Sequence, residues 1–109
     1  MSWNETEMDV IRWSEARGII PNSTSVAQYR KAQEEMHELH TALIQRDRRG
    51  IIDGVGDVLV CLINICALEN VTMTHCLKSA YLQIKDRRGT LLPNGIFQKE
   101  EECKENNKT

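Results

Sequence analysis

The chain has 109 residues and carries 14 Lys and Arg against 16 Asp and Glu, a formal net charge of -2. This length allows one domain with a modest core, and the balanced charge excludes a general attraction to nucleic acid. The polar, acidic first ten residues predict no signal peptide, and the apolar stretch 58–68 is too short to cross a bilayer. We therefore expect a soluble, cytoplasmic protein with no membrane partner.

Its elements can be predicted in chain order. A first helical pattern of apolar residues ends at Gly18, and the segment 19–25, which contains a Pro-Asn pair, predicts a loop. One of the last three residues of this loop, each Ser or Thr, is expected to cap the next helix. Residues 26–46 lack Gly and Pro and repeat apolar residues every three or four positions, which predicts that helix. Asp-Arg-Arg-Gly at 47–50 predicts a turn.

A third helix, about residues 51–68, is apolar around nearly its whole circumference. Such a helix is expected to be buried on all sides, which in a short chain implies contacts from a second subunit. A fourth helix begins with Thr72 or Thr74 as its cap and continues to about residue 88. The rest holds a Pro-Asn-Gly turn and a charged tail.

Together these elements predict an all-α fold that resembles a four-helix bundle. Residues 1–99 are expected to form one helical domain, and the polar residues 100–109 a disordered tail. No alternation of apolar and polar residues indicates β-strands. Self-association to a homodimer or homotetramer would complete the bundle.

The four cysteines are Cys61, Cys66, Cys76 and Cys103, and no pair forms a Cys-x-x-Cys motif. Their spacing fits neither a disulfide framework nor a zinc site. We expect reduced, partly buried thiols, as is typical of intracellular proteins.

Three carboxylates, Glu34, Glu35 and Glu38, lie within one turn of the second predicted helix. Like charges at this spacing repel one another, whereas a hard divalent cation such as Mg²⁺ would turn that repulsion into ligation. A solvated acidic face is an equally good explanation of the three glutamates taken alone.

The third predicted helix adds Asp53 and Asp57, one turn apart, just before its apolar run. Aspartates are favoured in the first turn of a helix, which explains Asp53 well and Asp57 poorly. A carboxylate beside a buried stretch needs a partner or a metal. We therefore expect acidic residues of two antiparallel helices to converge on one metal ion.

The sequences E-E-M-H-E at 34–38, G-D-V-L-V-C-L at 56–62 and K-D-R-R-G at 85–89 carry a resemblance. The chain resembles the MazG-like all-α nucleoside triphosphate pyrophosphohydrolases, in particular the small phage-type members, over about residues 10–100. The resemblance implies Mg²⁺-dependent hydrolysis of nucleoside triphosphates to the monophosphate and pyrophosphate. For a phage protein, the compartment would be the host cytoplasm.

The same resemblance implies metal ligation by Glu35, Glu38 and Asp57, with Glu34 as a supporting carboxylate. One position departs from the family pattern E-x-x-D, because Gly54 stands three residues before Asp57. Asp53, within roughly 60° of Asp57 on the helical wheel, is the expected substitute. Mg²⁺, with Mn²⁺ as an alternative, would neutralise phosphate charge. The three glutamates form the expected catalytic set, with Glu34 or Glu38 as the base that activates water.

Four further residues are candidates for binding the nucleotide. Lys31 lies one turn before the glutamates, and the resemblance favours Lys85 and Arg88 as phosphate contacts, although cations are also favoured at helix C-termini. Asn64 lies two turns beyond Asp57 and can bind a base or sugar, or be a satisfied core residue. Trp13 is expected to be a core aromatic rather than a base contact.

Two other interpretations have weaker support. The substitution at Gly54 keeps open a catalytically inactive, oligomeric regulator with the same fold. A di-iron redox bundle would need a second E-x-x-H motif besides Glu34–His37, and the sequence has none. We therefore predict that His37 and His40 are surface or interface residues.

Overall fold

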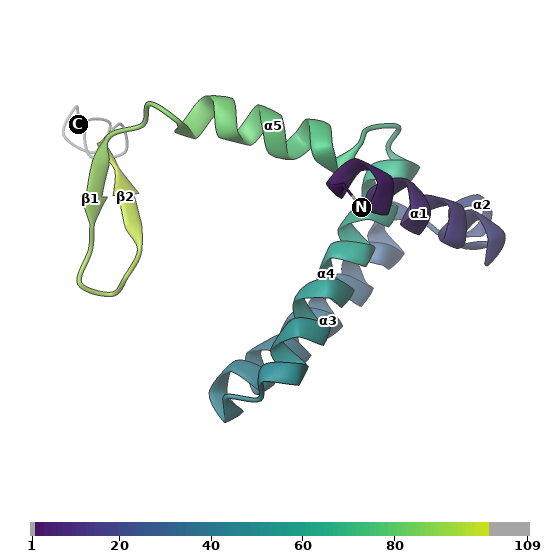
Figure 1. Cartoon of the computed structure of the whole chain (residues 1–109), viewed down its shortest axis with the longest axis horizontal. Helices are drawn as coiled ribbons and strands as arrows, with labels where there is room; N and C mark the ends of the chain where they lie inside the picture. Colours follow the sequence, from purple (N-terminus) through teal and green to yellow (C-terminus); the bar gives the residue numbers. More distant parts are fainter. Residues whose placement is uncertain (1, 101–109) are drawn as a thin grey trace. The chain divides into compact units, whose positions relative to one another are not determined.

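The structure of the protein is a computed structural model, which describes residues 2–100. In chain order the elements are the helices α1 (Trp3–Ala16), α2 (Ile19–Asn22), α3 (Ser25–Gln45), α4 (Arg48–Leu68) and α5 (Met73–Ile84) and the strands β1 (Gly89–Leu91) and β2 (Phe97–Lys99) (Figure 1). They group into two compact units, one up to Cys76 and one from Leu77 onward. The predicted polar tail at 100–109 lies, apart from Glu100, outside the described residues.

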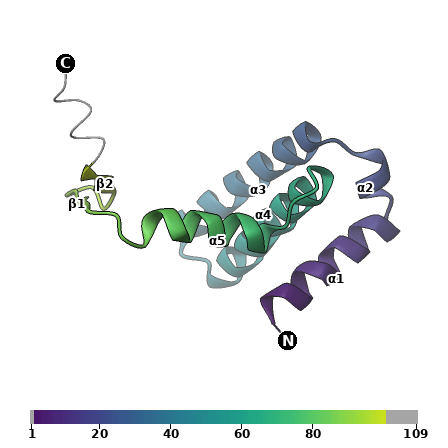
Figure 2. The same ribbon diagram turned by 90° about the horizontal axis from the view of Figure 1, so that it is seen from above.

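The first unit is built on a helical hairpin. Helices α3 and α4 run antiparallel along their whole length, and α1 packs against α4 with α2 between α1 and α3 in the chain (Figures 1 and 2). The predicted loop at 19–25 is wrong in part, because residues 19–22 form the short helix α2. Gly18 has φ 79°, a left-handed conformation that ends α1 where the sequence predicted.

Helix starts follow the expected capping chemistry. Thr24 accepts a hydrogen bond from the Ala27 N–H (3.1 Å) and caps α3, as one of the three predicted candidates. Asp47 accepts one from the Gly50 N–H (3.1 Å). Asp47 is thus the N-cap of α4, which begins at Arg48. The turn predicted at 47–50 is therefore mostly the first turn of this helix.

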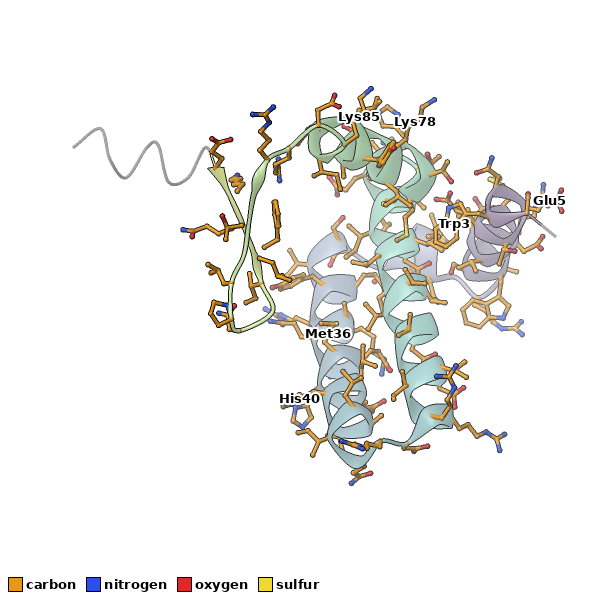
Figure 3. All side chains as sticks on the ribbon, turned by 60° about the vertical axis from the view of Figure 1, so that its left-hand side comes forward. Trp3, Glu5, Met36, His40, Lys78 and Lys85 are labelled. Carbon is orange, nitrogen blue, oxygen red and sulfur yellow. The ribbon has the colours of Figure 1, made fainter. Side chains whose placement is uncertain are left out.

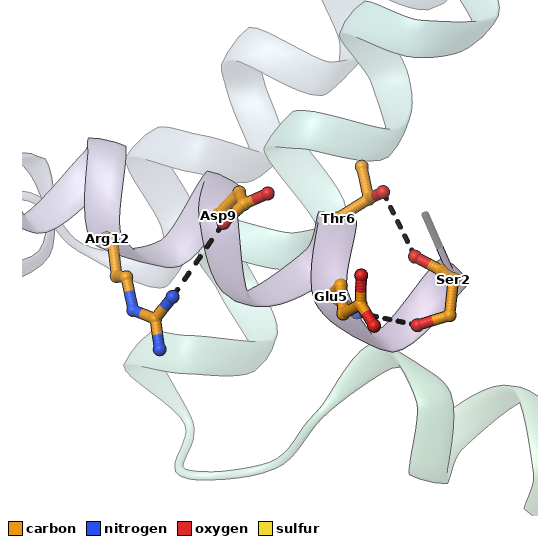
Figure 4. A network of polar contacts seen from close by, with 5 residues as sticks. All are labelled: Ser2, Glu5, Thr6, Asp9 and Arg12. Carbon is orange, nitrogen blue, oxygen red and sulfur yellow. Dashed lines mark hydrogen bonds and ion pairs between the residues drawn. The ribbon is translucent and has the colours of Figure 1, made fainter.

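Helix α1 has a cap of its own and a short network on its exposed side (Figure 4). The Ser2 hydroxyl accepts a hydrogen bond from the Glu5 N–H (3.2 Å), and the Thr6 hydroxyl donates to the Ser2 carbonyl (3.1 Å). Asp9 and Arg12 form an ion pair at 3.7 Å. These exposed contacts support the helix locally and contribute little to tertiary stability.

Glu7 joins α1 to the start of α5. Its buried carboxylate accepts hydrogen bonds from the backbone N–H groups of Met73 (2.5 Å) and Thr74 (3.2 Å) and from the Thr74 hydroxyl (2.6 Å). Burial alone would raise the pKa of Glu7, but these hydrogen bonds outweigh it and lower that pKa. A carboxylate from one helix thus serves the free N–H groups at the N-terminus of another.

The second unit contains the rest of α5 and a β-hairpin. Strands β1 and β2 are antiparallel, with Thr90 opposite Gln98. They are joined by a turn in which Gly95 has φ 86° and donates to the Leu92 carbonyl (2.9 Å). The Pro-Asn-Gly turn was predicted correctly, but the strands were missed, because three residues are too few to show alternation.

Within the first unit, helix α4 is not covered on all sides. Its buried residues lie toward α3 and α1, whereas Ile52 is 61% exposed and Val55 44%. Within residues 2–100, α4 is also the one helix long and apolar enough to cross a membrane by length and composition. Core helices of water-soluble proteins pass the same test. The expected burial of α4 by a second subunit stays a prediction.

Candidate active site

The polar side chains of interest lie on the faces where α3 and α4 meet. On α3 this face carries residues at alternating steps of four and three, Gln28, Ala32, Glu35, Leu39 and Ala42, and the face of α4 carries Gly50, Gly54, Asp57, Cys61 and Asn64. Because the helices are antiparallel, a step of seven residues along α3 is matched by a step of seven back along α4. Gly50 thus faces Ala42, Asp57 faces Glu35, and Asn64 faces Gln28.

Small residues bring the two helices close together. A Cβ built on Gly54 would lie 3.1 Å from the Leu39 Cβ and 3.2 Å from the Leu39 Cα. A backbone atom cannot move aside as a side-chain end can. A side chain at position 54 would require α3 to move by a few tenths of an ångström, so the close approach of Leu39 favours glycine at the place where the E-x-x-D pattern has glutamate.

Glu35 and Asp57 form an acidic pair across this interface. Glu35 is buried, with 8% of its surface exposed, and among the described residues its Oε2 atom has no hydrogen-bond partner. Partial desolvation, and then the charges of Glu35 and Asp53, raise the pKa of Asp57. Protonated Asp57 can also hydrogen-bond Glu35, which favours the neutral form further.

One cation faces the pair. Lys31 Nζ lies 3.4 Å from Glu35 Oε1 and 3.3 Å from Glu34 Oε2. Its hydrogen bonds to Glu34 and then to Glu35 raise the pKa of Lys31. The predicted phosphate contact is thus engaged with two carboxylates, and a phosphate would have to compete with Glu34 for it.

A cavity of about 500 Å³ opens above this pair. Glu35, Asp57 and Lys31 line one part of it, and the amide side chains of Gln28 and Asn64 line another. The cavity thus combines charged groups and neutral hydrogen-bonding groups within the size range of small-molecule sites.

Trp13 also lines this cavity, and it is 48% exposed. The Arg17 guanidinium lies 5.4 Å from its ring centroid. The prediction that Trp13 is a core aromatic is wrong, because the end of α1 lies at the rim of the cavity and not over the centre of the hairpin. An indole at that place offers a flat apolar surface to a ligand.

A second cavity of about 330 Å³ lies farther along the hairpin, toward the turn between α3 and α4. Glu38, Asp53 and Asp57 line it together, so Asp57 borders both cavities. The structure therefore distributes the other three predicted metal ligands around Asp57, with Glu35 on one side and Glu38 and Asp53 on the other.

These residues fit a divalent cation only in part. Within residues 2–100, no three His, Cys, Asp or Glu side chains converge closely enough to form a metal-binding group. Two facing carboxylates and an unpaired buried oxygen nevertheless form the kind of arrangement that a hard cation stabilises. Glu35 and Asp57 are positioned for a cation, and Glu38 and Asp53 are exposed and would have to turn toward it.

Asn64 is almost completely buried, with 2% of its surface exposed, and it is hydrogen-bonded. It accepts from the Ser14 hydroxyl (2.6 Å) and donates to Gln28 Oε1 (3.0 Å). Gln28 was missed in the sequence, where it is one polar residue among many. The signal that can find it is its place seven residues before Glu35, opposite Asn64 on an antiparallel neighbour.

The remaining candidates lie away from this interface or in the other unit. His37 and His40 are exposed on α3, and Figure 3 shows His40 projecting from α3 on the side away from α4, in agreement with the prediction. Lys85 and Arg88 belong to the second unit, between α5 and β1. Their predicted role in binding phosphate stays a prediction.

The described cysteines are free, with Cys61 buried, Cys66 half-buried and Cys76 exposed. Burial raises the pKa of the Cys61 thiol. Burial and the neighbouring Cys76 raise the pKa of Cys66 to about 11. Both thiols therefore stay protonated at neutral pH, and a protonated thiol is a poor nucleophile. Cys103 lies outside the described residues.

No model of a known protein family and no curated protein matches the sequence. Among solved structures, the chain is similar to a MazG-like pyrophosphohydrolase of cyanophage S-2L, with a TM-score of 0.67 and 21% sequence identity. The match covers 91% of this chain and 97% of that chain.

This chain has the MazG-like fold. The predicted all-α class and the resemblance to phage-type members are thereby confirmed at the level of fold. The structure of the cyanophage protein contains dGDP and three catalytic Mn²⁺ ions per active site. In the MazG-like fold of this chain, the cavity beside Glu35 and Asp57 is the candidate active site.

Proposed function

We propose that this protein hydrolyses nucleoside triphosphates, or their deoxy forms, to the monophosphate and pyrophosphate with a bound divalent cation. The observation that carries the proposal is the Glu35–Asp57 pair, with its unpaired buried oxygen, at one end of a cavity of about 500 Å³. The MazG-like fold supports the same activity, because the cyanophage relative binds a nucleotide and catalytic Mn²⁺.

A cation, Mg²⁺ or Mn²⁺, would be held by Glu35 and Asp57, with Glu38 and Asp53 completing the set from the second cavity. When bound, it supplies charge neutralisation on the phosphates and polarisation of the phosphorus that water attacks. Lys31 is positioned to exchange its contact with the exposed Glu34 for a phosphate oxygen, because Nζ and Glu34 Oε2 are 3.3 Å apart. Glu34, once released, or Glu38 then accepts the proton of the attacking water.

The rest of the chain orients the nucleotide. The triphosphate would lie toward Lys31 and the acidic pair, and the base toward Trp13 and Gln28 at the other part of the cavity. We propose that the molecule works as a homodimer or homotetramer, since the apolar face of α4 with Ile52 and Val55 is uncovered within the first unit. The proposed location is the cytoplasm.

The test is release of pyrophosphate from a panel of ribo- and deoxynucleoside triphosphates with Mg²⁺ or Mn²⁺, with Asp57→Ala as control. We expect at least one substrate to be hydrolysed with metal, and kcat to fall about 1,000-fold in Asp57→Ala, on the scale of losing an essential electrostatic group. Activity of the wild type no higher than that of Asp57→Ala, with every nucleotide, would refute the proposal.

Two observations favour a second candidate, an inactive regulatory module with the same fold. Residues 2–100 contain no assembled group of three metal-binding side chains, and Gly54 stands where the family pattern has an acid. The same panel separates the two, because a regulator would bind nucleotide, measured by calorimetry, without releasing pyrophosphate from any of them.

A further inference from the structure

A chain of four hydrogen-bonded side chains crosses the first unit beside the cavity. The Ser14 hydroxyl donates to Asn64 Oδ1 (2.6 Å), Asn64 Nδ2 donates to Gln28 Oε1 (3.0 Å), and Gln28 Nε2 donates to the Ser23 hydroxyl (3.1 Å). We call this set the amide relay. It joins α1, α4 and α3 to the residue that ends α2, and Ser14 at its inner end is fully buried.

The amide relay has a property that follows from the chemistry of its ends. Both amides are directional, since each has a donor side and an acceptor side, whereas a serine hydroxyl both donates and accepts. If Asn64 and Gln28 turn over together, Asn64 donates to Ser14, Gln28 donates to Asn64, and Ser23 donates to Gln28. Each of the three bonds is still made. The buried Ser14 hydroxyl can then turn its proton to the backbone carbonyl of the preceding turn of α1, a common bond of helical serines, so reversal need not leave it without an acceptor.

Gln28 and Asn64 line the cavity, so the direction of the relay matters to a ligand. Each amide retains one unused N–H and one unused carbonyl lone pair after its bonds within the relay. Reversal of the relay exchanges the positions of these donors and acceptors. A base with an amino group needs an acceptor opposite it, and a base with a carbonyl at the same place needs a donor. The two directions of the relay accommodate one kind of base each.

We propose that the amide relay makes the base subsite tolerant, so that Gln28 accepts bases whose donor and acceptor positions are exchanged. This inference rests on the proposed function, because it places the base of a nucleotide against Gln28. Ser14 and Ser23 are positioning residues in this account, because they act on the ligand only through the two amides.

Two pairs of nucleotides test the relay, because their members have similar size and exchanged edges. Cytosine and uracil differ in this way, and so do adenine and hypoxanthine. Isothermal titration calorimetry in Mg²⁺ would measure the binding of the α,β-methylene analogues of dCTP, dUTP, dATP and dITP. Binding is the readout because it does not depend on turnover. We expect the wild type to bind the two members of at least one pair with Kd values within about threefold of each other.

The decisive variant is Ser23→Asp, which replaces an end that both donates and accepts with one that only accepts. The carboxylate introduced by this substitution would hold the Gln28 Nε2 group toward itself and fix one direction of the relay. Position 23 precedes α3, where a carboxylate is favoured by the helix N-terminus, so folding should be preserved. We expect discrimination of about tenfold or more within the pair that the wild type tolerates, the scale of one mispaired buried polar group.

Ser23→Ala is the matched control, because it removes the same hydroxyl but favours neither direction of the relay. The ratio of Kd values within each pair of analogues should stay near that of the wild type. The inference is overturned if the wild type binds none of the four analogues, if it already discriminates tenfold within both pairs, or if Ser23→Asp leaves every ratio unchanged. Pyrophosphate release is scored separately: a protein that binds these analogues as expected but hydrolyses no nucleotide refutes the proposed function and leaves the relay supported.

Discussion

Two polar clusters occupy one helical interface, two turns apart, and they differ in how far their groups are satisfied. In the amide relay, Gln28 and Asn64 are neutral and bonded to each other and to serines at both ends. In the acidic pair, Glu35 and Asp57 face each other as acceptors, and Glu35 Oε2 has no partner among the described residues. Both clusters are equivalent in register, so the contrast lies in chemistry and not in position.

The two clusters therefore have different roles at one interface: the amide relay stabilises the fold, and the acidic pair is suited to function. Buried polar groups support a fold when each has a partner, and they destabilise it when they lack one. The amide relay therefore fixes α1 and α2 against the hairpin, whereas the acidic pair is a local weakness that a cation would relieve. Functional sites are commonly places where such unfavourable charge is retained.

The first test of this comparison is thermal stabilisation by metal. If the acidic pair binds Mg²⁺ or Mn²⁺, a concentration about 100-fold above Kd should add about 2.7 kcal/mol to the free energy of unfolding. For a domain of this size that corresponds to a rise in Tm of roughly 10–20 °C. Differential scanning calorimetry with and without metal measures it.

Two variants give this measurement its control. Glu35→Gln should abolish most of the rise in Tm, because it removes the charge of the buried carboxylate. Glu34→Gln makes the same chemical change at the neighbouring exposed residue, and this variant should retain most of the rise in Tm with metal. Equal rises in both variants would show that the metal binds elsewhere.

The amide relay, unlike the acidic pair, should contribute to stability without metal. Asn64→Ala leaves the Ser14 hydroxyl and Gln28 Oε1 without their partner, so we expect a loss of about 2–4 kcal/mol in the free energy of unfolding. Asp57→Ala, at the equivalent place two turns away, should cost well under ~1 kcal/mol without metal, because Asp57 is exposed and faces like charge. Urea unfolding of both variants in EDTA would measure this, and equal losses would contradict the comparison.

The sequence predicts one cluster much better than the other, for a physical reason. Glu35 and Asp57 are charged residues beside apolar runs, and helical spacing alone places each of them beside the apolar face of its own helix. Gln28 has no such local signal, because its importance comes from Asn64 on another helix and from Ser14 on a third. Likewise, Gly54 looks like a missing ligand in the sequence, whereas the structure shows that it also permits the close approach of Leu39, which depends on helix packing.

A smaller effect tests the spacing between the two helices. Gly54→Ala would place a Cβ 3.1–3.2 Å from Leu39, including its backbone Cα, and should destabilise the protein by about 1–3 kcal/mol. A Cβ at Gly56, on the same helix, would meet nothing within 4 Å, so Gly56→Ala should stabilise by about 0.5–1 kcal/mol through helix propensity alone. Opposite signs in chemical unfolding are expected, and the same sign in both would refute the close contact.

The smallest expected effect is the pH dependence of the acidic pair without metal. The pKa of Asp57 is raised in the folded protein, by partial desolvation first and then by Glu35 and Asp53. The folded state therefore holds its proton more tightly than the unfolded state, so stability falls as pH rises from the unfolded pKa of 3.8 through the folded pKa. Asp57→Asn should accordingly raise Tm by about 1–3 °C at pH 7 in EDTA, since exposed charges contribute less than about 1 kcal/mol. This advantage should disappear below pH 3.8, where both forms of the protein are neutral at position 57. Melting curves of the two proteins across pH would show a constant difference instead if the pair did not repel.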